Sequence, residues 1–292
     1  MKKVVFILLL LVFIGCKKEE SKIIKTDDFE LIIAKEQNGL LILFPGGGGS
    51  PENIKREFKI VDAAKKKGIS LLMVNFARKL WVEDEDCEKL SILIKSVIKE
   101  QNLKTDNVYI GGMSIGGNVT LSLSQHLLKN NILPIKGTFI VDSPIDLFGL
   151  YESSIKDINN KELSEERLSE PKWIVNYFEE SFSKDSLLFN IQKSSPVTLK
   201  TNNYSNISEL KNKKLRFYIE PDIDWYENIR KTDFKSTNAY TIQQLYVLLK
   251  ESNWKALELK ESKNKGYRSN GDRNPHSWSI INVDNLLNWI LE

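Results

Sequence analysis

Short, almost uninterrupted apolar runs alternate along the chain with longer segments in which apolar positions recur every three or four residues. The runs predict strands over 29–34, 40–44, 69–76, 107–111, 137–141, 215–219 and 254–259. The longer segments predict helices over 51–67, 87–100, 118–129, 237–250 and 285–291. Strands that are apolar on both faces and alternate with helices indicate a mostly parallel sheet with helices on both faces. We therefore expect an α/β fold.

One part of the chain departs from this alternation. Residues from about 145 to 214 are polar and irregular, apart from a helix expected over 171–182 that carries Trp173 and Tyr177. We expect this interval to be an insertion at one end of the sheet.

The first fifteen residues differ in character from the rest. Lys2 and Lys3 precede an apolar run over 4–14, which as a helix would span about 16 Å, half of a bilayer's hydrocarbon core. The run is too short to cross a membrane and is typical of a secretory signal peptide. The residues Phe-Ile-Gly-Cys that end at Cys16 resemble the lipobox of bacterial lipoproteins. The resemblance implies that residues 1–15 are removed and that Cys16 is lipidated.

A polar tether over 16–28 is expected to follow the signal peptide. Its Lys-Lys-Glu-Glu at 17–20 is similar to the export signal of Bacteroidetes surface lipoproteins. These resemblances imply a protein anchored by Cys16 to the bacterial outer membrane, with the leaflet left open.

Composition narrows the possible functions. The chain has 292 residues, of which 41% are hydrophobic and 10% aromatic, enough for a large globular domain. A formal charge of +3, from 42 Lys+Arg against 39 Asp+Glu, is too weak to indicate a nucleic-acid partner. Two His and two separated Cys, Cys16 and Cys87, exclude a Cys/His metal cluster. We expect no metal, no cofactor and no internal disulfide.

The strongest chemical signal is Gly-Met-Ser-Ile-Gly at 112–116. An apolar strand leads directly into it and a helix leads directly out. This context is typical of a nucleophile elbow, in which a sharp turn exposes the serine hydroxyl. We therefore expect Ser114 to be a catalytic nucleophile.

A serine nucleophile needs a base, and the chain has only two histidines. His126 lies twelve residues after Ser114 on the same expected helix, about 18 Å along its axis, and cannot reach the hydroxyl. His276 lies in a polar loop between the last strand and the last helix, where α/β sheets place reactive groups. We expect His276 to be the general base.

A carboxylate should orient the imidazole. The segment Glu-Pro-Asp-Ile-Asp-Trp at 220–225 follows the strand over 215–219. We favour Asp224, because a turn there would bring its carboxylate over the sheet, with Asp222 as the second choice. The remaining candidates are Asp142, Asp146 and Glu220.

The oxyanion of an acyl-transfer intermediate needs backbone N–H donors that are already in place. Ile115 can supply one, directly after the nucleophile. The Pro-Gly-Gly-Gly-Gly run at 45–49 can supply the other from Gly46 or Gly47. A phosphate-binding loop is the rival interpretation, but the run lacks the Gly-Lys-Ser/Thr ending and the later ribose-binding acid that such loops have.

The order glycine loop, Gly-x-Ser-x-Gly elbow, Asp and late His resembles the serine esterase and lipase-like branch of the α/β-hydrolase superfamily. The resemblance covers 29–292 and implies a cap between the sixth and seventh strands, which matches 145–214. The family's first strand is not obvious here, and Pro45 stands where the family usually has a His. Ser195-Pro196 also resembles a segment of esterases and prolyl-oligopeptidase-like hydrolases.

We therefore expect a serine hydrolase that cleaves carboxylic esters, either small or linked to polysaccharide, through an acyl-enzyme on Ser114. Trp225, Tyr226 and Trp278, together with the cap aromatics, either stack on the substrate or pack the core. The alternatives are a peptidase of the prolyl-oligopeptidase-like type and a catalytically silent binding module on this scaffold. The oligomeric state stays open.

Overall fold

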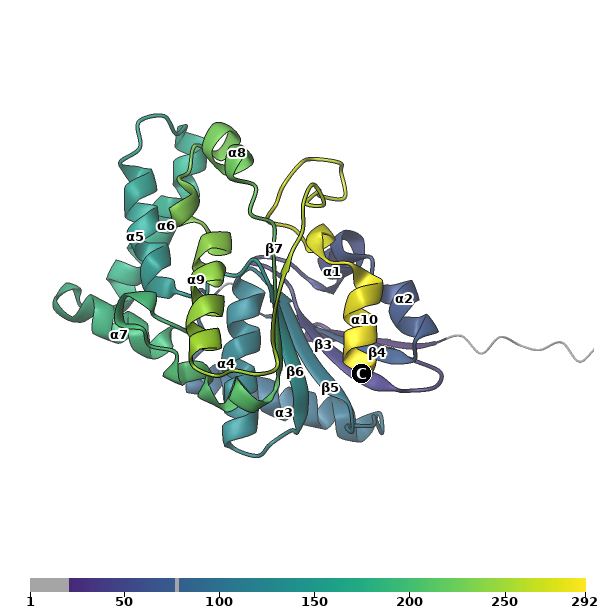
Figure 1. The fold of residues 1–292 in the computed structure, drawn as a ribbon. Helices are drawn as coiled ribbons and strands as arrows, with labels where there is room; N and C mark the ends of the chain where they lie inside the picture. Colours follow the sequence, from purple (N-terminus) through teal and green to yellow (C-terminus); the bar gives the residue numbers. More distant parts are fainter. Residues whose placement is uncertain (1–20, 77–78) are drawn as a thin grey trace, which may run out of the picture.

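The computed structural model describes residues 21–76 and 79–292, and within them eight strands form one sheet (Figure 1). In chain order the strands are β1 Lys22–Lys25, β2 Phe29–Ile33, β3 Gly39–Phe44, β4 Ile69–Val74, β5 Val108–Met113, β6 Ile135–Val141, β7 Lys214–Ile219 and β8 Leu257–Glu261. Their spatial order is β1-β2-β4-β3-β5-β6-β7-β8. The β1–β2 and β2–β4 pairs are antiparallel, and the pairs from β4 to β8 are parallel. The expected mostly parallel α/β sheet is confirmed.

Helices cover both faces of the sheet. One face packs against α1 Pro51–Phe58, α2 Val61–Lys66 and α10 Val283–Leu291, and the other against α3 Asp84–Glu100, α4 Ile115–Lys129 and α9 Asn238–Glu251 (Figure 1). Strand β3 shows why its sequence is continuously apolar. Leu40 and Ile42 point into the core on the α4 side, whereas Leu41 and Leu43 point into the core on the α1 side, because successive side chains alternate between faces.

The single helix expected over 51–67 is two helices in the structure. Ser50 caps α1 by accepting a hydrogen bond from the Asn53 N–H, with Pro51 as the first helical residue, as the sequence indicates. Lys59 then adopts the left-handed conformation, with φ 53°, and this ends α1. Periodicity alone did not reveal the break, because the apolar spacing continues across it.

The structure has a strand at the edge of the sheet where the sequence shows no obvious first strand. Lys22–Lys25 form β1 and pair with β2, so part of the expected tether over 16–28 belongs to the domain. The strand is four residues long, and Lys22, Ile23 and Lys25 are exposed, so it carries no apolar run of its own. Its conformation comes from pairing with β2, a contact that a local pattern does not show.

The expected insertion lies between β6 and β7. It contains α5 Leu147–Ile158, α6 Glu165–Ser181 and α7 Leu187–Ser194, followed by short 3-10 turns. These helices lie together beyond one end of the sheet (Figure 1) and share a small apolar core in which Trp81 packs against Phe178. The helix expected over 171–182 is the second half of α6, which begins earlier because Ser164 caps it.

No helix within the described residues has both the length and the apolar character needed to cross a membrane. The signal peptide and Cys16 lie outside the described residues, so the predictions made for them stay predictions.

Candidate active site

Ser114 lies in a strained turn between β5 and α4. Its backbone has φ 55° and ψ −130°, a region that non-glycine residues rarely occupy and that is found mainly at functional sites. The flanking glycines are required by close packing. A Cβ on Gly112 would lie 2.1 Å from the Gly116 carbonyl oxygen, and one on Gly116 would lie 2.2 Å from that of Pro45. The strand–turn–helix expected around Ser114 is confirmed.

The glycine-rich loop lies against this turn. A Cβ on Gly46 would be 3.5 Å from the Ser114 Cβ, and one on Gly47 would be 3.2 Å from the Ile115 Cδ1. The N–H groups of Gly46 and Gly47 donate no hydrogen bond to any described residue. Ile115 is the first residue of α4, where an N–H has no acceptor within the helix. The structure thus places the three predicted oxyanion residues beside Ser114, with N–H groups that have no acceptor among the described residues.

His276 is hydrogen-bonded to Asp142, whose Oδ2 lies 2.6 Å from the imidazole Nδ1. Asp142 directly follows β6 and is buried. Its N–H donates to the Tyr218 carbonyl at 2.9 Å, and its carbonyl accepts from the Asn238 amide at 3.0 Å. The backbone of Asp142 is therefore fixed on both sides, and Oδ2 of its carboxylate can orient the imidazole.

This arrangement corrects the prediction of Asp224 as the orienting acid. Asp224 is exposed in the short helix α8, Ile223–Trp225, while Asp222 caps that helix by accepting from the Trp225 N–H at 3.1 Å. Asp146 accepts hydrogen bonds from the N–H groups of Gly149 and Leu199, both at 2.9 Å, and so holds the start of α5. Strands β6 and β7 are parallel neighbours, so both end beside His276, and the sequence alone did not decide between them.

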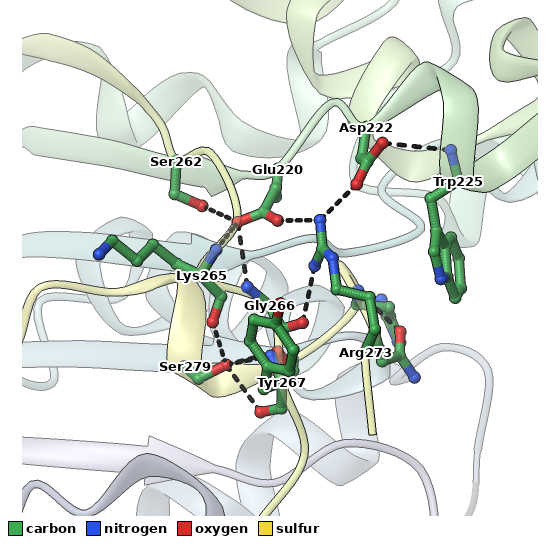
Figure 2. Close-up of polar contacts among 12 residues, drawn as sticks. Glu220, Asp222, Trp225, Ser262, Lys265, Gly266, Tyr267, Arg273 and Ser279 are labelled. Carbon is green, nitrogen blue, oxygen red and sulfur yellow. Dashed lines mark hydrogen bonds and ion pairs between the residues drawn. The ribbon is translucent and has the colours of Figure 1, made fainter. Parts of the chain in front are cut away.

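Glu220, another of the acid candidates, anchors the loop that carries His276 (Figure 2). It directly follows β7 and its carboxylate is buried. Its Oε2 accepts from the Ser262 hydroxyl at 2.6 Å, the Lys265 N–H at 2.9 Å and the Gly266 N–H at 3.1 Å. Its Oε1 forms an ion pair with Arg273. The loop after β8 is therefore bound to the end of β7.

Arg273 completes this anchor three residues before His276. Its guanidinium pairs with both Glu220 and Asp222 and donates to the Gly266 carbonyl at 2.6 Å (Figure 2). The next residue, Asn274, accepts a hydrogen bond from the His276 N–H at 2.9 Å. This role cannot be predicted from the sequence, because nothing in the local pattern around Arg273 distinguishes it from a solvated arginine.

A cavity of about 490 Å³ joins these groups. Its wall includes Ser114, His276, Asp142, Gly46 and Gly47. No hydrogen bond joins the Ser114 hydroxyl to His276 within the described structure, and such bonds often tighten only when substrate is bound. His126, as expected, is remote, in the last turn of α4.

The aromatic residues near the site divide into two groups. Trp173, Trp225 and Tyr226 line the cavity, and burial raises the pKa of Tyr226, so its phenol stays neutral. Trp278 instead stacks on Phe58 in the core with ring centroids 4.5 Å apart, and Tyr177 packs against Trp81.

Solved structures with a similar fold include esterases, lipases and other serine hydrolases. A hormone-sensitive lipase from a metagenome library has a TM-score of 0.57 and 16% identity, over 93% of this chain and 86% of its own. Carboxyl esterase 2 of Tuber melanosporum has a TM-score of 0.57 and 13% identity, over 93% and 85%. The fluorophosphonate-binding serine hydrolase FphF of Staphylococcus aureus has a TM-score of 0.51 and 11% identity, over 93% and 97%.

No family model and no curated protein sequence matches this chain. At these identities the structural likeness shows the fold, which is the α/β-hydrolase fold. The function has to be argued from the site.

Proposed function

We propose that the protein is a serine hydrolase that cleaves carboxylic esters through an acyl-enzyme on Ser114. The observation that carries this is the meeting of a strained nucleophile elbow and an Asp142–His276 pair in one cavity. A serine in a passive turn needs neither a φ of 55° nor an imidazole fixed by a buried carboxylate.

The residues have distinct roles in this reaction. The hydrogen bond from Nδ1 to Asp142 leaves Nε2 of His276 as the atom that accepts the Ser114 proton. The Ser114 oxygen then forms the new bond to the ester carbonyl carbon. The bond to the alcohol breaks as His276 returns the proton to the leaving oxygen. A water molecule activated by His276 hydrolyses the acyl-enzyme in the same way and frees Ser114.

The negative charge that develops on the carbonyl oxygen needs donors. The Ile115 N–H and those of Gly46 and Gly47 are unpaired among the described residues and lie beside Ser114. Donors of this kind contribute about 3 kcal/mol each to transition-state stabilisation in serine hydrolases. The first turn of α4 adds a favourable dipole at the same place.

We further propose that Cys16 carries a lipid anchor at the outer membrane and that the ester is small or linked to polysaccharide. Trp173 and Trp225 support a sugar-containing substrate, because both line the cavity and Trp173 is 43% exposed, so each can stack on a ring. The peptidase alternative gains no support from Ser195-Pro196. The Ser195 hydroxyl is buried and accepts a hydrogen bond from the Leu147 N–H at 2.9 Å, which is a structural role in the cap.

The test is labelling with a fluorophosphonate probe together with a panel of 4-nitrophenyl esters, acetylated xylan and peptide anilides. We expect labelling and ester hydrolysis in the parent and the loss of both in Ser114→Ala. Ser122→Ala, at a half-buried position in the middle of α4 that does not line the cavity, is the control and should keep both. Labelling that survives in Ser114→Ala, or turnover of anilides without turnover of esters, would exclude the proposed activity.

A further inference from the structure

Two arginines that line the cavity have side chains without a hydrogen-bonded or ion-paired partner among the described residues. Among the residues that the structure describes, four arginine side chains have polar partners: Arg56 with Glu57, Arg167 with the Arg230 carbonyl, Arg216 with Glu258, and Arg273 with Glu220 and Asp222. In the same part of the chain, Arg230 and Arg268 make no side-chain hydrogen bond or ion pair, and both line the cavity that contains Ser114 and His276.

Arg268 is the more buried of these two arginines. Its side chain is partly buried, and burial lowers the pKa of its guanidinium. Glu57 acts in the opposite direction through its charge, but no hydrogen bond or ion pair joins it to Arg268 within the described structure. The Glu57 carboxylate is hydrogen-bonded to the Arg56 Nε and to the N–H and hydroxyl of Ser269. A partly desolvated cation without a partner is unfavourable. An anion in the cavity would relieve that cost.

The backbone around Arg268 is fixed before any ligand binds. The Arg268 N–H donates to the Asp272 carbonyl, and its own carbonyl accepts from the Gly271 N–H, both at 2.9 Å. The neighbouring Tyr267 N–H donates to the Ser279 hydroxyl at 2.7 Å (Figure 2). Arg268 thus lies on the same anchored loop as His276, and a group held on such a frame loses little freedom on binding.

Arg230 is placed differently. It is exposed at the end of the segment after α8, and it lowers the pKa of Asp157 against the larger opposite effect of burial. The segment after α8 and the loop after β8 lie on different sides of the end of β7 (Figure 1). Each arginine thus interacts with one carboxylate through its charge, Arg230 with Asp157 and Arg268 with Glu57, but only Arg268 is partly withdrawn from solvent.

We propose that Arg268 binds an ionised carboxylate of the substrate, so that the enzyme prefers esters that carry a second, anionic carboxylate group. The inference rests on the proposed esterase function and names its substrate class. A planar guanidinium matches a carboxylate with two parallel hydrogen bonds. The carboxylate can belong to the acyl part or to the alcohol part of the ester, and the two arms of the test separate these.

The test compares charged and neutral esters of matched shape. The acyl pair is 4-nitrophenyl hemisuccinate and 4-nitrophenyl 4-oxopentanoate, and the alcohol pair is 3-acetoxybenzoate and 3-acetoxybenzamide. The readout is the ratio of kcat/KM for the charged ester to that for the neutral ester within each variant, which cancels any general loss of active protein. In at least one pair the parent ratio should exceed one, and Arg268→Gln should lower it by about tenfold to a hundredfold, the loss of one charged hydrogen-bonded pair.

Two further variants sharpen the comparison. Arg268→Lys keeps the charge but lacks the planar guanidinium that can form two parallel hydrogen bonds. It should lower the ratio less than Arg268→Gln does. Lys263→Gln removes the same charge from an exposed position on the same loop, outside the cavity, and should leave the ratio at the parent value. A ratio in Arg268→Gln within about twofold of the parent for both pairs, or an equal fall in Lys263→Gln, would overturn the proposal.

A binding measurement keeps this result separate from the esterase proposal. If no ester is turned over, the proposed activity fails, and calorimetry on Ser114→Ala protein still tests the subsite. In that background we expect 3-acetoxybenzoate to bind more tightly than 3-acetoxybenzamide, and Arg268→Gln to weaken its binding by at least about tenfold. Equal binding of the acid with and without Arg268 would overturn the proposal.

Discussion

Ser114 and Asp142 share an unusual backbone conformation. Each follows the last residue of a strand, and their φ values of 55° and 42° are positive. The N–H of each still donates to the next strand, from Ser114 to Val141 and from Asp142 to Tyr218, both at 2.9 Å. The sheet thus continues its hydrogen bonding through residues whose conformation is strained. The strain occurs where the chain must leave the sheet and present a side chain at its edge.

The carboxylate beside His276 can be tested by a single substitution. Asp142→Asn should reduce kcat about ten-thousand-fold, because the amide cannot hold the imidazole in the productive tautomer. Asp224→Asn is the matched control, since Asp224 is exposed on α8, and should stay within about threefold of the parent. Kinetics with a 4-nitrophenyl ester, on proteins of matched thermal unfolding, measure both. A larger loss at Asp224 than at Asp142 would contradict the assignment.

The loop after β8 places His276, and the position of this loop depends on residues distant in sequence. The elbow around Ser114 could be predicted because strand, turn and helix are contiguous there. The acid could not be predicted, because β6 and β7 end side by side. Each is followed by a carboxylate, Asp142 or Glu220, that can reach the loop after β8. Glu220 binds the backbone of that loop, which leaves Asp142 to meet the imidazole. That division of roles is set by tertiary contacts.

The second prediction tests whether the contacts of Glu220 with the loop after β8 place His276. Glu220→Gln removes a carboxylate that is 1% exposed from its pair with Arg273, and breaking a buried ion pair costs about 3 kcal/mol or more. We expect a lower free energy of unfolding and also a kcat lowered by about tenfold to a hundredfold, because His276 would lose its fixed position. Urea unfolding and steady-state kinetics measure the two effects separately.

Glu258→Gln is the control for Glu220→Gln. Glu258 lies in β8 and pairs with the buried Arg216, away from the cavity. Its loss should lower stability, by less because Glu258 is 36% exposed, and leave kcat unchanged. If Glu220→Gln lowered stability but kept the parent kcat, the anchor would have no role in placing His276.

The fold of the whole domain could be predicted largely because its central strands are buried on both faces and are therefore apolar throughout. Strand β1 could not be predicted, because three of its four residues are exposed and its conformation depends on pairing with β2. The structure places β1 at one edge of the sheet and β8, which leads into the His276 loop, at the other. Six residue steps from Cys16 to Lys22 span at most about 21 Å. A lipid on Cys16 would therefore hold the domain near the membrane by the edge remote from β8.

The third prediction concerns the proposed lipid anchor on Cys16. Cys16→Ala should release the protein from the membrane fraction, because the substitution removes the residue proposed to carry the acyl chains. Several acyl chains on one cysteine bind a bilayer far more firmly than a single chain does. Cys87→Ala is the control: its thiol is buried, and burial raises its pKa to about 12, so we expect no lipid there and unchanged membrane association. Fractionation with a carbonate wash, followed by immunoblotting, measures the distribution. Cys16→Ala protein that stays with the washed membranes would refute the lipid anchor.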